Sequence, residues 1–401
     1  MSAAAESLGL QLEEQQLPSE RPIVIVGNGP VGMRFAHELL GRIPDQSLVI
    51  YGDEQHQPYN RVRLSSWLAG EVDWDELTQP LDPDHAGQVE QRFGYRILDV
   101  DRDAGTVTDS RGRIQPYGRL VLATGSKPFV PQIPGIDLQG VFTFRDLNDV
   151  NSLMARRARS HRTVVIGGGL LGLEAARGMQ RANTQVTVLE HADRLLGRQL
   201  DEDASALLQE QVEALGIDVI IGDGVALISG EGRVSGVRLR SGRELPCDTL
   251  IVAAGIRPNI SLARAARLAY GRGIQVDDAM RTSDPRIYAV GECAEHRGQV
   301  YGLVAPGLEQ AAVAASDIAG QPGRYTGSVA ASRLKVVGTQ VFSMGPMGAG
   351  EDPLYGRTFV YRDEADAVYR KILVRRHRLV GIIGIGEWPE TVRLQTTIGR
   401  S

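Results

Sequence analysis

The sequence predicts an α/β protein with two three-layer domains of one design, followed by a small C-terminal α+β domain. A strand-like apolar run that breaks into spaced glycines and continues as a helix occurs twice, at 23–32 and 164–175. The elements that follow each copy come in the same order, with a period of roughly 140 residues, as in an internal repeat. Residues 328–401 instead alternate between apolar and polar side chains, which indicates strands of a separate domain.

The second copy contains a full nucleotide-binding pattern. Its strand leads into Gly167, Gly169 and Gly172, and the next apolar run ends at Glu190, 23 residues after Gly167. Strand, glycine turn, helix, strand and acid in this order form the dinucleotide-binding fingerprint, in which the helix N-terminus faces a pyrophosphate. Glu190 can accept hydrogen bonds from both ribose hydroxyls and would repel a 2'-phosphate. We therefore expect NADH rather than NADPH.

The first copy has Gly27, Gly29 and Gly32 at the same spacing, and its second strand ends at Asp53 and Glu54. A single glycine pattern is weak evidence because such turns arise by chance. Two copies, each with strand, helix, second strand and acid, are strong evidence. Two dinucleotides on one chain suggest FAD and NAD, because hydride passes usefully between a nicotinamide and a flavin.

The repeat divides the chain into five segments. They are a flexible tail at 1–20, the first part of an FAD-binding domain at 21–145, an NAD-binding domain at 146–265, the second part of the FAD-binding domain at 266–326, and a C-terminal interface domain at 327–401. This order matches two related Rossmann-like folds, one of which is interrupted by the other.

The other elements follow from local patterns. Residues 95–123 alternate like an antiparallel ribbon and end in a buried strand at Gly125, and a matching strand ends at Gly255. A further strand runs into Gly291, and residues 308–319 form an Ala-rich helix. In the C-terminal domain we expect strands at Leu334–Phe342, Thr358–Tyr361, Ala367–Val374 and Leu379–Ile385.

Bulk properties exclude several classes of function. The net charge of −5 gives no reason to expect nucleic-acid binding. Cys247 and Cys293 are the only cysteines, so a disulfide framework, a zinc site or a four-cysteine cluster is improbable and we expect no metal. Two unpaired thiols fit a reducing cytoplasm. No apolar run reaches the 18 residues of a membrane span, and the first 20 residues lack the features of a secretory signal.

Four stretches carry a family resemblance: Pro58–Ser66, Arg198–Asp201, Gly291–Gly298 and Val300–Pro306. They resemble the pyridine nucleotide-disulfide oxidoreductase superfamily. Within it they are most similar to the FAD/NAD-binding part of the large subunit of NADH-dependent assimilatory nitrite reductases, and next to rubredoxin and ferredoxin reductases. The residues from Ser332 onward resemble the module that follows in nitrite reductases.

The resemblance, with the two fingerprints, gives two sets of candidate site residues. The expected FAD-binding residues are Gly27, Gly29, Pro30, Gly32, Asp53, Glu54, Arg61, Ser65, Ser66, Thr124, Gly125, Gly291, Glu292 and Leu308. The expected NAD-binding residues are Gly167, Gly169, Leu170, Leu171, Gly172, Glu174, Glu190, Ala254 and Gly255.

The resemblance also implies roles. Asp53 or Glu54 would bind the adenosine ribose and Glu292 the ribityl chain, and a helix starting near Leu308 would point its positive end at the flavin pyrimidine. Glu174 would lie near the nicotinamide and the flavin, as the one candidate catalytic residue. Alternatively, Glu174 only complements the dipole of its helix, and Arg61 is a solvated arginine on a loop.

The departures from the family pattern are informative. Residues 33–66 contain no cysteine, whereas disulfide reductases of this superfamily carry a CxxxxC motif there. NADH oxidases have one redox cysteine where this chain has Ser66, and rubredoxin reductases often have a lysine there that can pair with the residue matching Glu174. We therefore expect no thiol relay. Nitrite reductase large subunits continue into cluster and sirohaem domains, so the chain resembles a detached NADH-oxidising half.

Three functions compete. The favoured one is the NADH-oxidising subunit of an assimilatory nitrate or nitrite reductase, with a partner chain that holds an iron–sulfur, haem or molybdenum centre. The second is a free-standing rubredoxin or ferredoxin reductase, and the third a non-enzymatic sensor or assembly protein. The basic run Arg370–Arg378 could dock an acidic partner or form an exposed hairpin. Trp388 could cover the flavin or simply pack.

Overall fold

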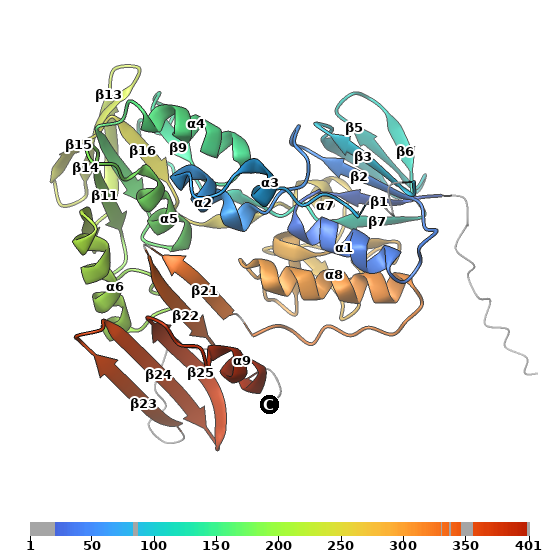
Figure 1. The fold of residues 1–401 in the computed structure, drawn as a ribbon. Coiled ribbons are helices and arrows are strands. Elements are labelled where there is room, and N and C mark those ends of the chain that lie inside the picture. Colours follow the sequence, from blue (N-terminus) through green and yellow to red (C-terminus); the bar gives the residue numbers. More distant parts are fainter. Residues whose placement is uncertain (1–20, 83–86, 330, 337, 346–355, 399–401) are drawn as a thin grey trace, which may run out of the picture.

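The computed structural model describes residues 21–82, 87–329, 331–336, 338–345 and 356–398. The expected tail at 1–20 lies outside the described residues. Within these residues the chain forms three five-stranded sheets, each with helices packed against it (Figure 1). The two nucleotide-binding-type sheets lie in the upper part of Figure 1, and the third sheet lies below the second.

The first sheet is parallel and has the order β19-β7-β1-β2-β3. Its strands are β1 (Ile23–Val26), β2 (Leu48–Gly52), β3 (Val89–Phe93), β7 (Arg119–Leu122) and β19 (Ile287–Ala289). All four residues of β1 are buried, as expected for a continuous apolar strand covered on both faces. Because β19, β7 and β1 are neighbouring parallel strands, the loops that follow them meet at the same edge of the sheet.

Helices α1 (Pro30–Leu40) and α8 (Val304–Ile318) lie side by side on one face of this sheet (Figure 1). A small antiparallel sheet covers the other face, with β4 (Ile97–Asp101), β5 (Thr106–Asp109) and β6 (Ile114–Pro116). The expected helix start near Leu308 was wrong, since α8 begins one turn earlier. Pro306 does not prevent this, because the first N–H groups of a helix have no partner within it.

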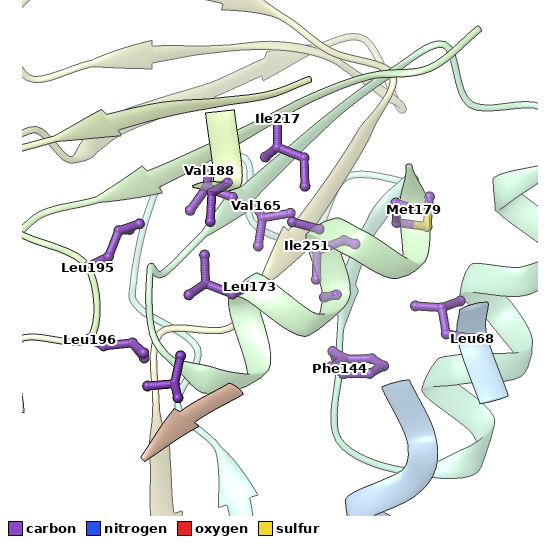
Figure 2. Packing of buried hydrophobic residues seen from close by; sticks show 14 of the residues in the cluster. Leu68, Phe144, Val165, Leu173, Met179, Val188, Leu195, Leu196, Ile217 and Ile251 are labelled. Atoms are coloured by element: carbon purple, nitrogen blue, oxygen red, sulfur yellow. The ribbon is translucent and has the colours of Figure 1, made fainter. Parts of the chain in front are cut away.

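The second sheet repeats the design with the order β12-β11-β10-β16-β9, all parallel. Its strands are β9 (Val141–Thr143), β10 (Arg162–Ile166), β11 (Gln185–Glu190), β12 (Ile217–Ile221) and β16 (Thr249–Val252). Helices α4 (Leu147–Arg157), α5 (Leu170–Met179) and α6 (Glu202–Ala214) cover one face, and β13 (Val225–Gly230), β14 (Val234–Leu239) and β15 (Glu244–Pro246) the other. Figure 2 shows Leu173 of α5 packed beside Val165 and Val188 of the sheet.

Short elements connect the two halves. Strands β8 (Ser126–Pro128) and β17 (Ile256–Pro258) pair antiparallel, one from each closing loop. The segment after β2 forms η1 (Arg61–Arg63), α2 (Leu64–Ala69) and α3 (Trp74–Leu77). Leu68 of α2 packs against α5 in the second half. The remaining elements are α7 (Ser261–Ala265), β18 (Ile274–Val276), η3 (Gly291–Cys293) and β20 (Ala294–His296).

The third sheet is antiparallel and has the order β21-β22-β25-β24-β23. Its elements are β21 (Ala331–Val336), β22 (Thr339–Met344), β23 (Gly356–Asp363), β24 (Val368–Arg375), β25 (Arg378–Ile385) and helix α9 (Thr391–Ile398). The expected single strand Leu334–Phe342 was wrong. Gly338, with φ of +92°, takes part in the turn that divides this run between β21 and β22.

The Asp201 carboxylate ties the third sheet to the second half of the molecule through two side chains. The Tyr369 hydroxyl donates to Oδ2 of Asp201 at 2.8 Å, and Nζ of Lys371 reaches the same oxygen at 2.9 Å. Asp201 is also the N-cap of α6, where it accepts from the Ala204 N–H at 3.0 Å. A single carboxylate therefore both starts a helix of the second half and anchors β24.

Candidate functional site

A cavity of about 2250 Å³ is lined by the carboxyl-end loops of both parallel sheets. Small-molecule pockets usually have volumes of ~300–1,000 Å³, so this cavity has room for more than one large ligand. Gly27 and Gly29 contribute from the first sheet, and Gly167 and Gly169 from the second. Both glycine turns therefore open into the same space.

In the first glycine turn the backbone packs closely on one side and is open on the other. A Cβ on Gly27, whose φ is +121°, would lie 2.1 Å from the Ala123 carbonyl oxygen, and one on Gly32 would lie 2.0 Å from the Gly27 carbonyl oxygen. A Cβ on Gly29, by contrast, would meet only Nε of Arg61, at 3.8 Å. The open side faces the cavity at the N-terminus of α1, which fits a pyrophosphate group.

The second turn has the same construction. A Cβ on Gly167, whose φ is +117°, would lie 2.4 Å from the Ala253 carbonyl oxygen, and one on Gly172 would lie 1.8 Å from the Gly167 carbonyl oxygen. A Cβ on Gly169 would meet nothing within 4 Å. This turn, at the N-terminus of α5, therefore also fits a pyrophosphate group.

Most of the expected site residues line the cavity. They are Gly27, Gly29, Pro30, Asp53, Glu54, Arg61, Thr124, Gly125, Gly167, Gly169, Leu170, Leu171, Glu174, Glu190, Ala254, Gly255, Gly291 and Glu292. Five expected residues do not line it: Gly32, Ser65, Ser66, Gly172 and Leu308. At the start of α8, Val304 and Ala305 line the cavity in place of Leu308, so the positive end of this helix still faces it.

The two acids after β2 differ in their surroundings. Asp53 forms an exposed ion pair with Arg96 at 2.8 Å. Glu54 is largely buried, accepts from the Tyr59 hydroxyl at 2.7 Å and pairs with Arg61. Arg61 also lies over the Tyr59 ring, 5.3 Å from its centroid. Arg61 is thus held in the cavity wall by two contacts and is not a freely solvated arginine.

Arg145, which sequence reasoning missed, holds Glu292 in place. Arg145 and Glu292 form a largely buried ion pair, and the Ser126 hydroxyl donates to Oε2 of Glu292 at 2.8 Å. Nε of Arg145 is buried and has no hydrogen-bond partner among the described residues. Arg145 follows β9, outside any fingerprint, and no pattern in the neighbouring sequence indicates a role for it. A buried donor without a partner at this wall fits a polar ligand.

Glu174 lies where the two nucleotide-binding halves meet. It lines the cavity from α5, and the Ser65 hydroxyl on α2 is close enough to favour its charged form. Burial raises the pKa of Glu174 from the usual 4.5 to about 7. The group can therefore hold or release a proton near neutral pH, which distinguishes it from a solvated glutamate that only complements a helix dipole.

Glu190 is buried at the end of β11 and is held by the backbone. Its two oxygens accept from the Gly168 N–H at 2.7 Å and from the Ala192 N–H at 2.8 Å. The cavity wall beside it also carries Arg194, Arg198 and Arg240. The expected preference for NADH therefore remains a prediction, because an acid and several cations line the same wall.

Neither cysteine takes part in the site. Cys247 and Cys293 are buried free thiols outside the cavity lining. Burial raises the pKa of Cys247 to about 12 and also raises that of Cys293. Trp388 packs in the core of the C-terminal sheet with Phe342 and Ile382. Within the described ranges no cluster of metal-ligating side chains occurs, and no described helix is long and apolar enough to cross a membrane.

Comparisons with known proteins agree with this geometry. Residues 21–317 match the family described as pyridine nucleotide-disulphide oxidoreductase, and residues 331–401 match the rubredoxin NAD+ reductase C-terminal domain. The chain is 41% identical to a nitrite reductase [NAD(P)H] of Bacillus subtilis over 94% of this chain and 47% of that protein. It is 39% identical to an assimilatory nitrate reductase electron transfer subunit of the same organism, over 93% and 48%. The chain thus spans about half the length of these relatives.

Solved structures show the same architecture. A ferredoxin reductase from Rhodopseudomonas palustris has a TM-score of 0.85 and 28% identity, over 92% of each chain. The covalent putidaredoxin reductase–putidaredoxin complex gives a TM-score of 0.86 and 28% identity, over 95% of this chain and 93% of that one. The α/β fold with two dinucleotide-binding folds is confirmed, as are the oxidoreductase class and the cofactors FAD and NAD. The chain belongs to the pyridine nucleotide-disulphide oxidoreductase family.

Proposed function

We propose that this chain oxidises NADH and passes the electrons through FAD to a separate redox protein, as the electron-transfer subunit of an assimilatory nitrate or nitrite reductase. The observation that carries the proposal is that both glycine turns open into one cavity. A nicotinamide held by one fold can then meet a flavin held by the other. Bound FAD would supply hydride acceptance from NADH and stepwise electron release.

The residues of the chain would bind and orient the two cofactors. We assign the turn of Gly27 and Gly29 to the FAD pyrophosphate and the turn of Gly167 and Gly169 to that of NAD. The Arg145–Glu292 pair would meet the sugar chain of the flavin, with Ser126 as a further polar contact. We also propose that the domain boundaries lie at residues 145, 265 and 326.

Glu174 would hold a proton at its carboxyl group close to where the two rings meet. Its raised pKa and its contact with Ser65 support this role. Ser66 offers no thiol, and both cysteines lie outside the cavity lining. Electrons would therefore leave the flavin for the partner without a protein disulfide.

The similarity to an assimilatory nitrate reductase electron transfer subunit supports a partner chain with an iron–sulfur, haem or molybdenum centre. Two reduced, buried thiols support a cytoplasmic location. A free-standing rubredoxin or ferredoxin reductase is the second candidate. The match of residues 331–401 to a rubredoxin reductase C-terminal domain and the fold of the ferredoxin reductase favour it.

An affinity pull-down of the tagged chain from nitrate-grown native cells, followed by mass spectrometry, separates the two candidates. We expect a molybdenum or sirohaem reductase chain to co-purify. As a control, the same pull-down from ammonium-grown cells should recover less of it. Recovery of only a small iron–sulfur or rubredoxin-type protein would support the second candidate.

A further inference from the structure

The loop at residues 194–200, which leads into α6, forms part of the cavity wall. Leu196, Arg198 and Gln199 line the cavity. The Leu196 N–H donates to the carbonyl oxygen of Gly168, inside the second glycine turn, at 3.1 Å. Leu196 has a left-handed backbone with φ of +48°, which a bulky residue adopts only where its surroundings enforce it. The 194–200 loop is therefore a fixed support for this turn.

The 194–200 loop is itself held by the first turn of α6 and by the third sheet. The Ser205 hydroxyl on α6 is buried and donates to the Leu195 carbonyl oxygen at 2.8 Å. The leucines at 195, 196 and 200 are buried in one apolar cluster that also contains Tyr369 of β24 (Figure 2). The loop therefore packs against both the second half of the molecule and the third sheet.

Asp201 connects the third sheet to the end of this loop. Its Oδ2 accepts from the Tyr369 hydroxyl at 2.8 Å and from Nζ of Lys371 at 2.9 Å, while Oδ1 accepts from the Ala204 N–H. The Asp201 and Lys371 side chains are only 16% and 14% exposed. Burial alone would raise the pKa of Asp201, but the hydrogen bonds from Lys371 and Tyr369 hold it below its usual range. The carboxylate therefore stays charged and fixes the geometry of the contact.

We propose that Asp201, Lys371 and Tyr369 are positioning residues for the NAD site. Through the Asp201 carboxylate, the third sheet holds the 194–200 loop and the glycine turn in the arrangement that binds the dinucleotide. None of the three residues lines the cavity, so their effect on binding passes through the loop. The inference rests on the proposed function in one respect, namely that the second glycine turn binds NAD.

Titration calorimetry of the FAD-loaded full chain with NAD+ tests the proposal without turnover. D201N keeps a side-chain oxygen for the cap, because asparagine caps helices as well as aspartate does, but it replaces the second oxygen with an NH2 donor. K371M removes the cation and keeps an apolar side chain. We expect each variant to raise the Kd for NAD+ about tenfold. The double variant should bind no more weakly than the worse single variant, because both changes break one contact.

The two variants also separate positioning from a simple charge effect. NAD+ is a net anion, so loss of the Asp201 charge alone would strengthen binding, and loss of the Lys371 charge alone would weaken it. A positioning role instead weakens binding in both variants. The KM for NADH should rise together with the Kd, while kcat stays unchanged, because neither residue touches the reacting atoms.

Two controls test whether the effect is specific. I383V removes a methyl group from the buried core of the third sheet, which should lower the thermal midpoint and leave the Kd unchanged. R357M removes a cation from the exposed strand β23 and should also leave the Kd unchanged. Because coupling is reciprocal, NAD+ should slow the exchange of β24 backbone amides in the unmodified chain, and this slowing should be lost in D201N.

The outcomes distinguish this inference from the proposed function. An unmodified chain that does not bind NAD+ would overturn both. If the unmodified chain binds NAD+ and D201N and K371M bind it equally well, the inference alone is overturned. A Kd that moves in opposite directions in these two variants, or binding in I383V that is as weak as in D201N, would also overturn it.

Discussion

The Glu174 carboxyl group on α5 lies near the Ser65 hydroxyl on α2, where the two nucleotide-binding halves pack against each other at the cavity. Burial raises the pKa of Glu174 to about 7, and the serine opposes this rise only in part. A lysine at the neighbouring position, Ser66, would supply a charge that this chain lacks. The site therefore contains a carboxyl group that is half protonated near neutral pH.

Glu174 should make stability fall as pH rises. The folded pKa is raised above the unfolded value, so the proton is held in the folded state and lost from the unfolded chain between about 4.5 and about 7. Over this window the folded state should lose up to ~3 kcal/mol, at ~1.4 kcal/mol per unit of pKa. E174Q should abolish this loss in urea titrations at pH 5 and 8. E231Q, at an exposed position, should retain it, and an unchanged pH profile in E174Q would contradict the raised pKa.

The glycine turns should separate binding from folding. G169V should raise the KM for NADH at least tenfold with little change in thermal midpoint, because its side chain enters open space at the cavity. G172V should instead destabilise the fold, because its Cβ would lie 1.8 Å from the Gly167 carbonyl oxygen. Thermal melting and steady-state kinetics on both variants provide the measurement. Equal effects of the two substitutions on stability would refute this distinction.

Arg145 should control flavin retention. R145M leaves the largely buried Glu292 carboxylate without its cation, and an unpaired buried charge costs about 3–5 kcal/mol. We expect the ratio of flavin to protein after purification to fall severalfold. R145M/E292Q removes both charges and should recover part of the stability, measured by urea unfolding. If the double variant is no more stable than R145M, the two residues act separately.

Glu190 should determine which nicotinamide cofactor is used. E190A removes the acceptor at the end of β11 and leaves Arg194, Arg198 and Arg240 on the same wall. The KM for NADH should rise and that for NADPH should fall. Glu190 also accepts hydrogen bonds from the Gly168 and Ala192 N–H groups. E190Q, which keeps one side-chain oxygen as an acceptor, is therefore the control for the loss of these two bonds. Equal use of NADPH by the unmodified chain would show that Glu190 does not discriminate.

The Asp201–Tyr369 contact should contribute measurably to stability. Y369F removes a hydrogen bond of 2.8 Å between the third sheet and α6, and such bonds are worth about 1 kcal/mol. We expect a small loss in urea unfolding. Y361F is the control, since Tyr361 is exposed on β23, and a loss of the same size there would contradict the assignment.

The fold was largely predictable because its signals are local. The glycine turns at Gly27 and Gly167, the acids after β2 and β11 and the repeat of elements all lie within short stretches of sequence. The expected start of α8 is one turn too late because Pro306, which usually interrupts a helix, lies in its first turn. The division at Gly338 was missed because the alternation of apolar and polar residues continues across the turn.

The contacts within the site were less predictable, because they join residues far apart in the sequence. Arg145 meets Glu292 across 147 positions, and nothing near either residue indicates the other. The tie between Asp201 and Tyr369 spans 168 positions. Whether Glu174 is charged depends on burial by both halves, which no local pattern encodes.

Anaerobic rapid mixing of the FAD-loaded chain with NADH tests the central claim most directly. If the two glycine turns bring nicotinamide and flavin together in one cavity, NADH should bleach the visible absorbance band of the flavin, and G169V should slow this bleaching at low NADH. A flavin that stays oxidised at saturating NADH would contradict the account and would favour a dinucleotide-sensing protein.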